Sequence, residues 1–82
     1  MTNGFDVNEK DRVVGTPLHL AIIKGQKKIA ELLITTGADV NAGDVIGKTP
    51  LDWAVIKRQS EIADLLRKHG GKTAAELKAE GK

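Results

Sequence analysis

Hydrophobic residues in this chain of 82 residues recur at the spacing of an α-helix in four segments. The clearest segment is 27–36, where Ile29, Leu32 and Leu33 lie at i, i+3 and i+4 and so share one stripe. This spacing predicts a helix that turns the stripe toward a core. Similar patterns predict three more helices, over 17–24, 50–57 and about 60–69.

Residues at the ends of these segments support the same boundaries. Thr-Pro begins two of the helices, at 16–17 and 49–50. Thr caps free backbone N–H groups there, and Pro has no backbone N–H that would need a partner. Gly25 ends the first helix, and Ser60 is the expected N-cap of the last. Segment 38–48 alternates only weakly and contains turn residues, which predicts an extended finger with a tight turn.

The chain also contains an internal copy of itself. Residues 16–42, TPLHLAIIKGQKKIAELLITTGADVNA, recur 33 positions later as TPLDWAVIKRQSEIADLLRKHGGKTAA. The positions that survive the shift are mainly apolar or turn residues, and a period of this size indicates stacked modules. Residues 1–11 align in the same way with 34–44, so we expect the chain to begin within the last part of a module.

The composition is that of a soluble globular protein, with 40% hydrophobic and 29% charged residues. There is no cysteine, which excludes a disulfide framework and a thiolate metal site. No apolar run is long enough for a membrane span, and the N-terminus has no apolar segment typical of a signal peptide. We therefore expect a cytoplasmic protein that does not insert into membranes.

The two TPL segments one period apart, with GADVNA between them, resemble ankyrin repeats. The resemblance covers about residues 4–71 and implies an all-α solenoid of stacked antiparallel helix pairs with β-hairpin-like finger loops. Within a single domain, 1–82, it implies the end of a partial repeat (1–11), a repeat (12–44), a second repeat (45–71) and a C-terminal capping helix with its tail (72–82).

The sequence departs from the ankyrin pattern at three points. Val14 stands where the family usually has glycine, and Gly15 follows it, which predicts a distorted turn. Arg58 replaces the helix-ending glycine of the first copy, where a left-handed conformation costs a residue with a side chain about 1 kcal/mol or more. The resemblance implies that His19 bonds to the turn backbone, a role that Asp52 of the second copy must fill differently.

The C-terminal residues leave the period. Thr73 and Glu76 form a capping-box pattern earlier than the next TPL is due, which predicts a short helix over 73–80. We expect this polar helix to cover the last helix pair, because terminal modules of a solenoid need a polar outer face.

Nothing in the sequence points to catalysis. Ser60 lies at a helix start and His19 in a turn-bonding motif, and neither shows a partner carboxylate. His19 and His69 have no metal-ligand spacing, and GDVIGKT is one residue short of a phosphate-binding loop. We therefore expect a non-enzymatic protein with no cofactor and no metal.

The resemblance implies that finger tips and the inner face of the first helices contact a protein partner. Carried over by position, this concave strip combines an apolar row with a basic row, which suits an acidic partner with a few apolar anchors. Its predicted partner-binding residues are Arg12, Val13, Ile23, Lys24, Val45, Ile46, Lys48, Ile56 and Lys57. The alternative is that these residues only support packing or are solvated.

Two further interpretations stay open. With no helix pair before the first one, we expect an apolar face there, with Ile22 and Ile34 exposed, so the chain is a piece of a longer array, a homodimer through this face or a complete small protein. A nucleic-acid binder is less favoured, because the acidic residues offset the cations and no aromatic platform is evident. Its cations would be Lys24, Lys27, Lys28, Lys57 and Arg58.

Overall fold

The computed structural model describes residues 15–81. In this part of the chain there are five helices: α1 (Pro17–Ile23), α2 (Lys27–Thr36), α3 (Pro50–Ile56), α4 (Ser60–Lys68) and α5 (Ala74–Gly81). Each lies within one residue of the helix predicted from sequence at both ends. Apart from an isolated bridge at Gly15, the described residues form no strand.

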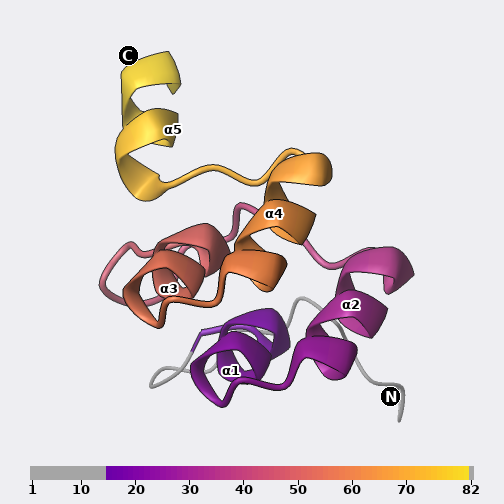
Figure 1. The fold of residues 1–82 in the computed structure, drawn as a ribbon. Coiled ribbons are helices and arrows are strands. Elements are labelled where there is room, and N and C mark those ends of the chain that lie inside the picture. The colour runs from indigo at the N-terminus through magenta and orange to yellow at the C-terminus, as the bar shows by residue number, and fades with distance from the viewer. Residues whose placement is uncertain (1–14, 82) are drawn as a thin grey trace, which may run out of the picture.

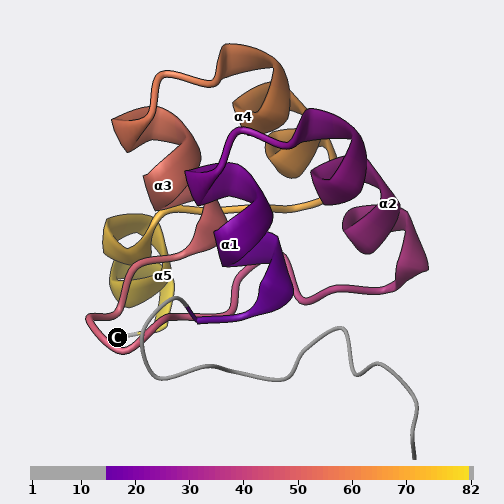
Figure 2. The ribbon, with the colours of Figure 1, turned by 90° about the horizontal axis from the view of Figure 1, so that it is seen from below.

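The helices form two stacked layers (Figures 1 and 2). α1 pairs with α2 and α3 pairs with α4, while α1 packs on α3 and α2 packs on α4. The two copies of the repeated sequence therefore lie one above the other in the same orientation. This arrangement confirms the predicted all-α fold of stacked helix pairs.

Small and branched apolar side chains fill the space between the layers. Alanines on three helices have no more than 1% of their surface exposed, which lets neighbouring helices approach closely. Single helices of seven to ten residues are marginal in water, so this shared burial is what stabilises them. The core consists of Leu18, Ala21, Ile22, Ala30, Leu33, Ile34, Ala38, Leu51, Ala54, Ile62 and Leu66.

Two predictions about apolar side chains were wrong. Ile22 and Ile34, expected to be exposed, are 0% and 6% exposed, because their sides of α1 and α2 are covered within the stack. Ile29 and Leu32, expected in the core with Leu33, are instead 47% and 64% exposed. The apolar stripe of α2 is wider than the surface that the rest of the described chain covers.

Three helices begin with the same reciprocal cap. In α1 the Thr16 N–H donates to His19 Nδ1 at 3.0 Å while the His19 N–H donates to Thr16 Oγ1 at 3.4 Å. α3 repeats this with Thr49 and Asp52. The box predicted before α5 is confirmed, and its members are Thr73 and Glu76.

The last helix pair is not covered as predicted. α5 extends away from the two layers (Figure 1), and none of its residues is buried. It is tied to the last pair at its first turn, where the Ala74 N–H donates to Asp52 Oδ2 at 2.9 Å and Arg67 forms an ion pair with Glu76. α5 lacks the stripe of large apolar residues that holds α1 and α3 in the stack, so it stays on the surface.

Helix-end predictions had mixed outcomes. Arg58 does adopt the left-handed conformation, with φ of 58°, at the position where the first copy has Gly25 with φ of 72°. Gly15 has φ of 87°, whereas in the second copy the positive φ lies one place earlier, at Gly47, so the turn is altered as expected. Ser60 is not an N-cap. Gln59 occupies that position and makes no side-chain cap hydrogen bond.

Candidate functional site

The finger between the two layers is built around one carboxylate. Asp44 Oδ1 accepts the N–H groups of Ile46 at 3.0 Å and Lys48 at 2.8 Å, and the Asp44 N–H donates to the Lys48 carbonyl at 2.9 Å. Gly47, with φ of 84°, supplies the left-handed residue that closes the turn. The predicted tight turn is therefore present without flanking strands.

Burial raises the pKa of the Asp44 carboxyl, but other contacts lower it by more. The indole N–H of Trp53 donates to Asp44 Oδ2 at 2.7 Å, and this bond acts with the two backbone bonds to hold the net pKa of Asp44 below its ordinary value. The carboxyl is thus ionised at neutral pH and fixes the finger to α3.

The finger tip presents apolar side chains to solvent. Val45 is 58% exposed and Ile46 is 65% exposed, although the backbone on both sides of them is held by Asp44. Lys48, at the base of the same turn, is part-buried. A fixed backbone that exposes two adjacent branched residues loses little conformational entropy when a partner binds.

The rest of the described strip lies at the C-terminal ends of α1 and α3. Ile23 is part-buried, Ile56 is 50% exposed, and the lysines that follow them, Lys24 and Lys57, are exposed. Ile23 and Ile56 are one period apart on helices that pack side by side, so the structure places them in one row. Arg12 and Val13 lie outside the described residues. That these residues bind a partner stays a prediction.

His19 joins the first helix pair to the finger. Its ring is 0% exposed, and its Nε2 lies 2.9 Å from the Lys48 carbonyl. Because Nδ1 accepts the N–H of Thr16, the ring proton must lie on Nε2, which donates to the Lys48 carbonyl. The turn-bonding role expected of His19 is confirmed.

The second copy fills this role with other atoms, as predicted. Thr49 Oγ1 donates to the Lys72 carbonyl at 2.6 Å, and Asp52 Oδ2 accepts the Ala74 N–H. Asn41 adds two bonds to the same segment, one from its Nδ2 to the Gly70 carbonyl and one to its Oδ1 from the Lys72 N–H. The segment before α5 is therefore fixed although α5 itself is exposed.

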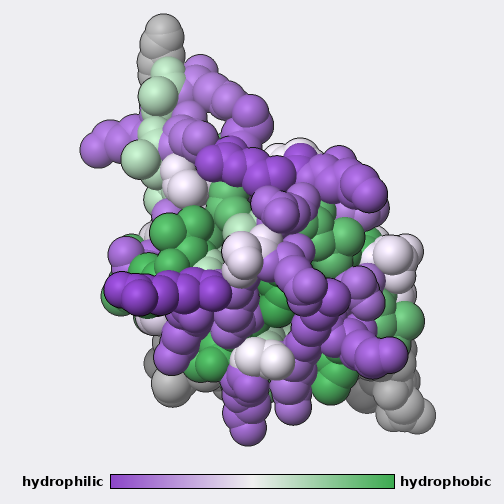
Figure 3. Space-filling view, in the orientation of Figure 1, coloured by the Kyte–Doolittle hydropathy of each residue, from purple (hydrophilic) through white to green (hydrophobic). Residues whose placement is uncertain are grey.

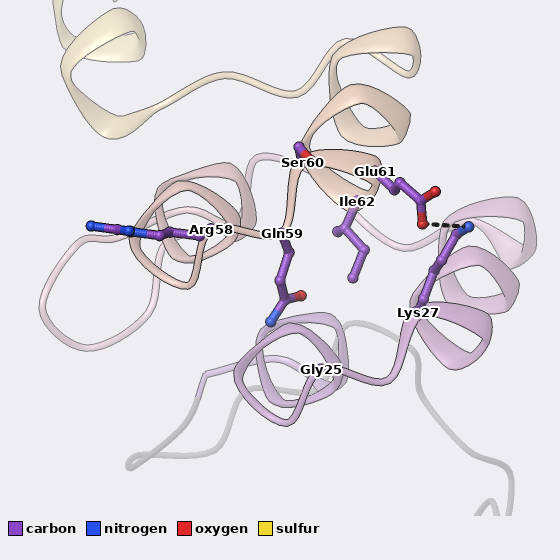
Figure 4. Close-up of a pocket in the computed structure, with 7 residues that line it drawn as sticks. All are labelled: Gly25, Lys27, Arg58, Gln59, Ser60, Glu61 and Ile62. Atoms are coloured by element: carbon purple, nitrogen blue, oxygen red, sulfur yellow. Dashed lines mark hydrogen bonds and ion pairs between the residues drawn. The ribbon is translucent and has the colours of Figure 1, made fainter.

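A hollow of about 410 Å³ lies at the opposite end of the helix pairs, between their turns (Figure 4). Gln59 reaches across it from the second pair, donating from Nε2 to the Ile22 carbonyl at 2.7 Å. Its two cations do not converge, because Lys27 pairs with Glu61 at 2.9 Å and Arg58 points away. We assign this hollow to contact between the repeats.

Within the described part of the chain, no cluster of three or more His, Cys, Asp or Glu side chains could hold a metal ion. No helix there is long and apolar enough to cross a membrane.

Comparison with known families decides what the stack is. A family model of ankyrin repeats, in three copies, matches residues 1–76. The chain belongs to the ankyrin repeat family. Ankyrin repeats are in general non-catalytic modules for protein–protein interaction. No curated protein matches the sequence.

Sequence reasoning also missed the exposure of Val55 in this ankyrin chain. Val55 is 58% exposed, whereas Ile22, one period earlier, is 0% exposed because α3 covers it. The equivalent cover for Val55 would come from α5, which instead leaves the stack (Figure 1). The sequence did contain a signal for this, because residues 73–80 have no apolar stripe with which a helix could cover Val55.

Proposed function

We propose that this ankyrin chain is a non-catalytic, cytoplasmic protein-binding module that holds its partner with the finger tip and the C-terminal ends of α1 and α3. The observation that carries the proposal is the exposure of Val45 and Ile46 on a turn fixed by three bonds to one carboxylate. These two branched side chains are exposed and are not among the core residues that stabilise the stack. Their exposure suits an apolar anchor site on a preorganised surface.

The cations at the C-terminal ends of α1 and α3, the second part of this proposed surface, support an acidic partner. Lys24, Lys57 and Arg58 are exposed, and among the described residues none of them takes part in an ion pair. Figure 3 shows hydrophilic side chains beside apolar atoms over α3. Exposed cations next to Ile23 and Ile56, with apolar residues at the finger tip, favour a segment that combines carboxylates with one or two apolar side chains.

The nucleic-acid alternative has less support. It needs five cations on one surface, but Lys27 is already neutralised by Glu61 at 2.9 Å and lies with Lys28 on α2. Lys24 and Lys57 belong to the other column of helices. A second alternative, that the chain serves as part of a longer array, calls for contacts on the open sides of the stack and none at the finger tip.

A pair of matched variants tests the proposal. Ile46→Glu and Leu32→Glu each place a carboxylate at a site of almost equal exposure, 65% and 64%, on different parts of the molecule. Both variants and the wild type would be used to capture partners from a cell extract. A photo-crosslinking residue at position 46 or 32 then identifies direct contacts, with circular dichroism confirming the fold.

We expect Ile46→Glu to lose captured proteins that Leu32→Glu retains, and crosslinks to form from position 46. Retention of the same proteins by Ile46→Glu would refute the finger-tip site. Capture of nucleic acid in place of protein, with binding that weakens steeply as salt is raised, would favour the basic alternative.

A further inference from the structure

The first helix of each pair ends on the same two residues, an isoleucine and then a lysine. α1 ends at Ile23 and α3 ends at Ile56, and the lysines that follow, Lys24 and Lys57, are the C-caps of these helices. Because α1 packs on α3 in the same orientation, this pair of residues recurs once per layer. Packed helices lie roughly 8–10 Å apart, so the isoleucine and the lysine recur at this spacing.

The charges at these helix ends all have one sign. Segments 23–26 and 56–59, IKGQ and IKRQ, contain three cations, Lys24, Lys57 and Arg58, and no acidic residue. In the part of the chain that the structure describes, none of these cations forms an ion pair. Figure 4 shows Arg58 pointing away from Glu61, which is already paired with Lys27. We name the following residues the helix-end strip: Ile23, Lys24, Ile56, Lys57 and Arg58.

We infer that the helix-end strip binds an acidic peptide in the polyproline II conformation, with an apolar and an acidic residue at every third position. The inference rests on the proposed function, because it names the partner of one part of that surface. A polyproline II chain has three residues per turn and rises about 3.1 Å per residue, so equivalent side chains recur about 9.3 Å apart. One turn of the peptide therefore spans one layer of the stack. Its carboxylates then meet the unpaired lysines, and its apolar side chains cover the half-exposed Ile56 and the open part of Ile23.

Other peptide conformations fit the strip less well. On a β-strand, side chains on one face recur about 6.6 Å or about 13 Å apart, and neither value matches the layers. An α-helix presents equivalent residues about 10.5 Å apart after two turns, which is close to the layer spacing. A helix that spans only two layers is, however, shorter than the roughly 12–15 residues that an isolated helix needs in water. It would have to order on binding, whereas prolines hold a polyproline II peptide in its bound shape beforehand.

Synthetic peptides test the spacing directly. The probe is a fluorescent peptide of three Pro-Leu-Glu units, in which leucine and glutamate each recur at every third residue. The matched control has the same composition in the order Pro-Pro-Pro-Leu-Leu-Leu-Glu-Glu-Glu. Fluorescence anisotropy at low salt should give a dissociation constant on the order of 100 µM for the probe and at least about fivefold weaker binding for the control.

Exchange of charge tests the role of the two lysines. Lys24→Glu/Lys57→Glu should weaken binding of the probe by more than about tenfold and instead bind a Pro-Leu-Lys peptide of equal length. Lys24→Gln/Lys57→Gln removes both charges without adding repulsion, so it should bind either peptide weakly. Lys28→Glu is the matched control, because Lys28 is exposed on α2 outside the strip, and it should bind the probe as the wild type does. Circular dichroism would confirm that all the variants keep their helices.

Equal binding of the probe and the control peptide would overturn the inference, and so would unchanged binding of the probe by Lys24→Glu/Lys57→Glu. Tighter binding of a helical peptide with leucine and glutamate at every seventh position would overturn the polyproline II conformation. These results are separable from the test of the finger tip. If Ile46→Glu loses its captured partners while the probe does not bind, the proposed function stands and this inference fails. If the probe binds as expected while Ile46→Glu retains its partners, the helix-end strip stands and the finger-tip site fails.

Discussion

Trp53 donates its indole N–H to Asp44 Oδ2 at 2.7 Å, which joins the second helix pair to the base of the finger that precedes it. Asp44 uses its other oxygen for two backbone N–H groups of the finger turn. One side chain therefore sets both the shape of the turn and its position on α3. The exposed tip residues, Val45 and Ile46, depend on it for their placement.

Replacing Asp44 with asparagine should destabilise the chain by about 2 kcal/mol. Asp44 accepts hydrogen bonds with both carboxylate oxygens, whereas an asparagine side chain has only one acceptor oxygen. Its NH2 group would therefore point at another donor, either the Trp53 N–H or the two backbone N–H groups. Urea unfolding at pH 7 would measure the loss. Asp64→Asn, on an exposed part of α4, is the matched control and should change stability by less than about 0.5 kcal/mol.

The same carboxyl predicts a dependence of stability on pH. Because the pKa of Asp44 is lowered in the folded chain, its contribution is complete above its unfolded value, roughly 4, and is lost as the pH falls through the folded value. Glu76, whose pKa the Arg67 guanidinium lowers to about 2, titrates in the same direction. The pKa of Glu61 is also lowered, by its bond to Lys27, so unfolding between pH 5 and 3 in a Glu61→Gln/Glu76→Gln background should isolate Asp44. Asp44→Asn should then flatten the remaining slope. An unchanged slope would contradict the assignment.

The turns that end α1 and α3 offer a matched pair of changes. Arg58 holds a left-handed conformation that costs a side-chain-bearing residue about 1 kcal/mol, so Arg58→Gly should stabilise the chain by roughly that amount. Gly25→Ala should have the reverse effect, because the same conformation has a φ of 72° and its added methyl group meets only Gln59 Nε2 at 3.8 Å. Thermal and urea unfolding of both variants would check the opposite signs.

Much of the stack follows from local sequence signals. Thr-Pro caps, turn glycines and the i, i+3, i+4 stripe place each helix to within one residue, because these signals act over one or two turns of chain. The wrong predictions concern which apolar residues are covered. Ile22 and Ile29 look alike in sequence, but only Ile22 faces a neighbouring layer. Whether such a residue is buried depends on how the helices are placed relative to one another. The spacing of apolar residues along one helix does not determine this placement.

Local sequence signals also predicted only part of the candidate site. Tip residues Val45 and Ile46 could be located from the turn signal, and their exposure follows from lying between Asp44 and Gly47. The bond between Trp53 and Asp44 could not be predicted, because it depends on how α3 meets the finger. Trp53 packs against the core, and it also holds the finger.

Gly15→Ala should be far more disruptive than Gly25→Ala, although both positions have positive φ. A methyl group on Gly15 would lie 2.8 Å from His19 Nδ1 and 2.9 Å from the Asp44 Cβ, so the strain of the backbone adds to a collision with two fixed side chains. We expect a loss of about 3 kcal/mol. Equal stabilities of the two alanine variants in urea would show that the turn relaxes and that the close approach is unimportant.

His19→Ala should cost about 3 kcal/mol and loosen the finger at the same time. The change leaves a cavity at a fully buried site and removes the partner of the Thr16 N–H and one donor to the Lys48 carbonyl. Asp52→Ala, at the matching position of the second copy, removes bonds at a part-buried site and should cost about 1.5 kcal/mol. Native-state hydrogen exchange separates the loss of global stability from local loosening of the finger. In His19→Ala, the Asp44 N–H, which donates to the Lys48 carbonyl, should exchange faster than the loss of global stability alone explains. In Asp52→Ala, its exchange should rise only as much as the loss of global stability explains. If both variants accelerate it only in proportion to their global destabilisation, then His19 stabilises the stack without positioning the finger.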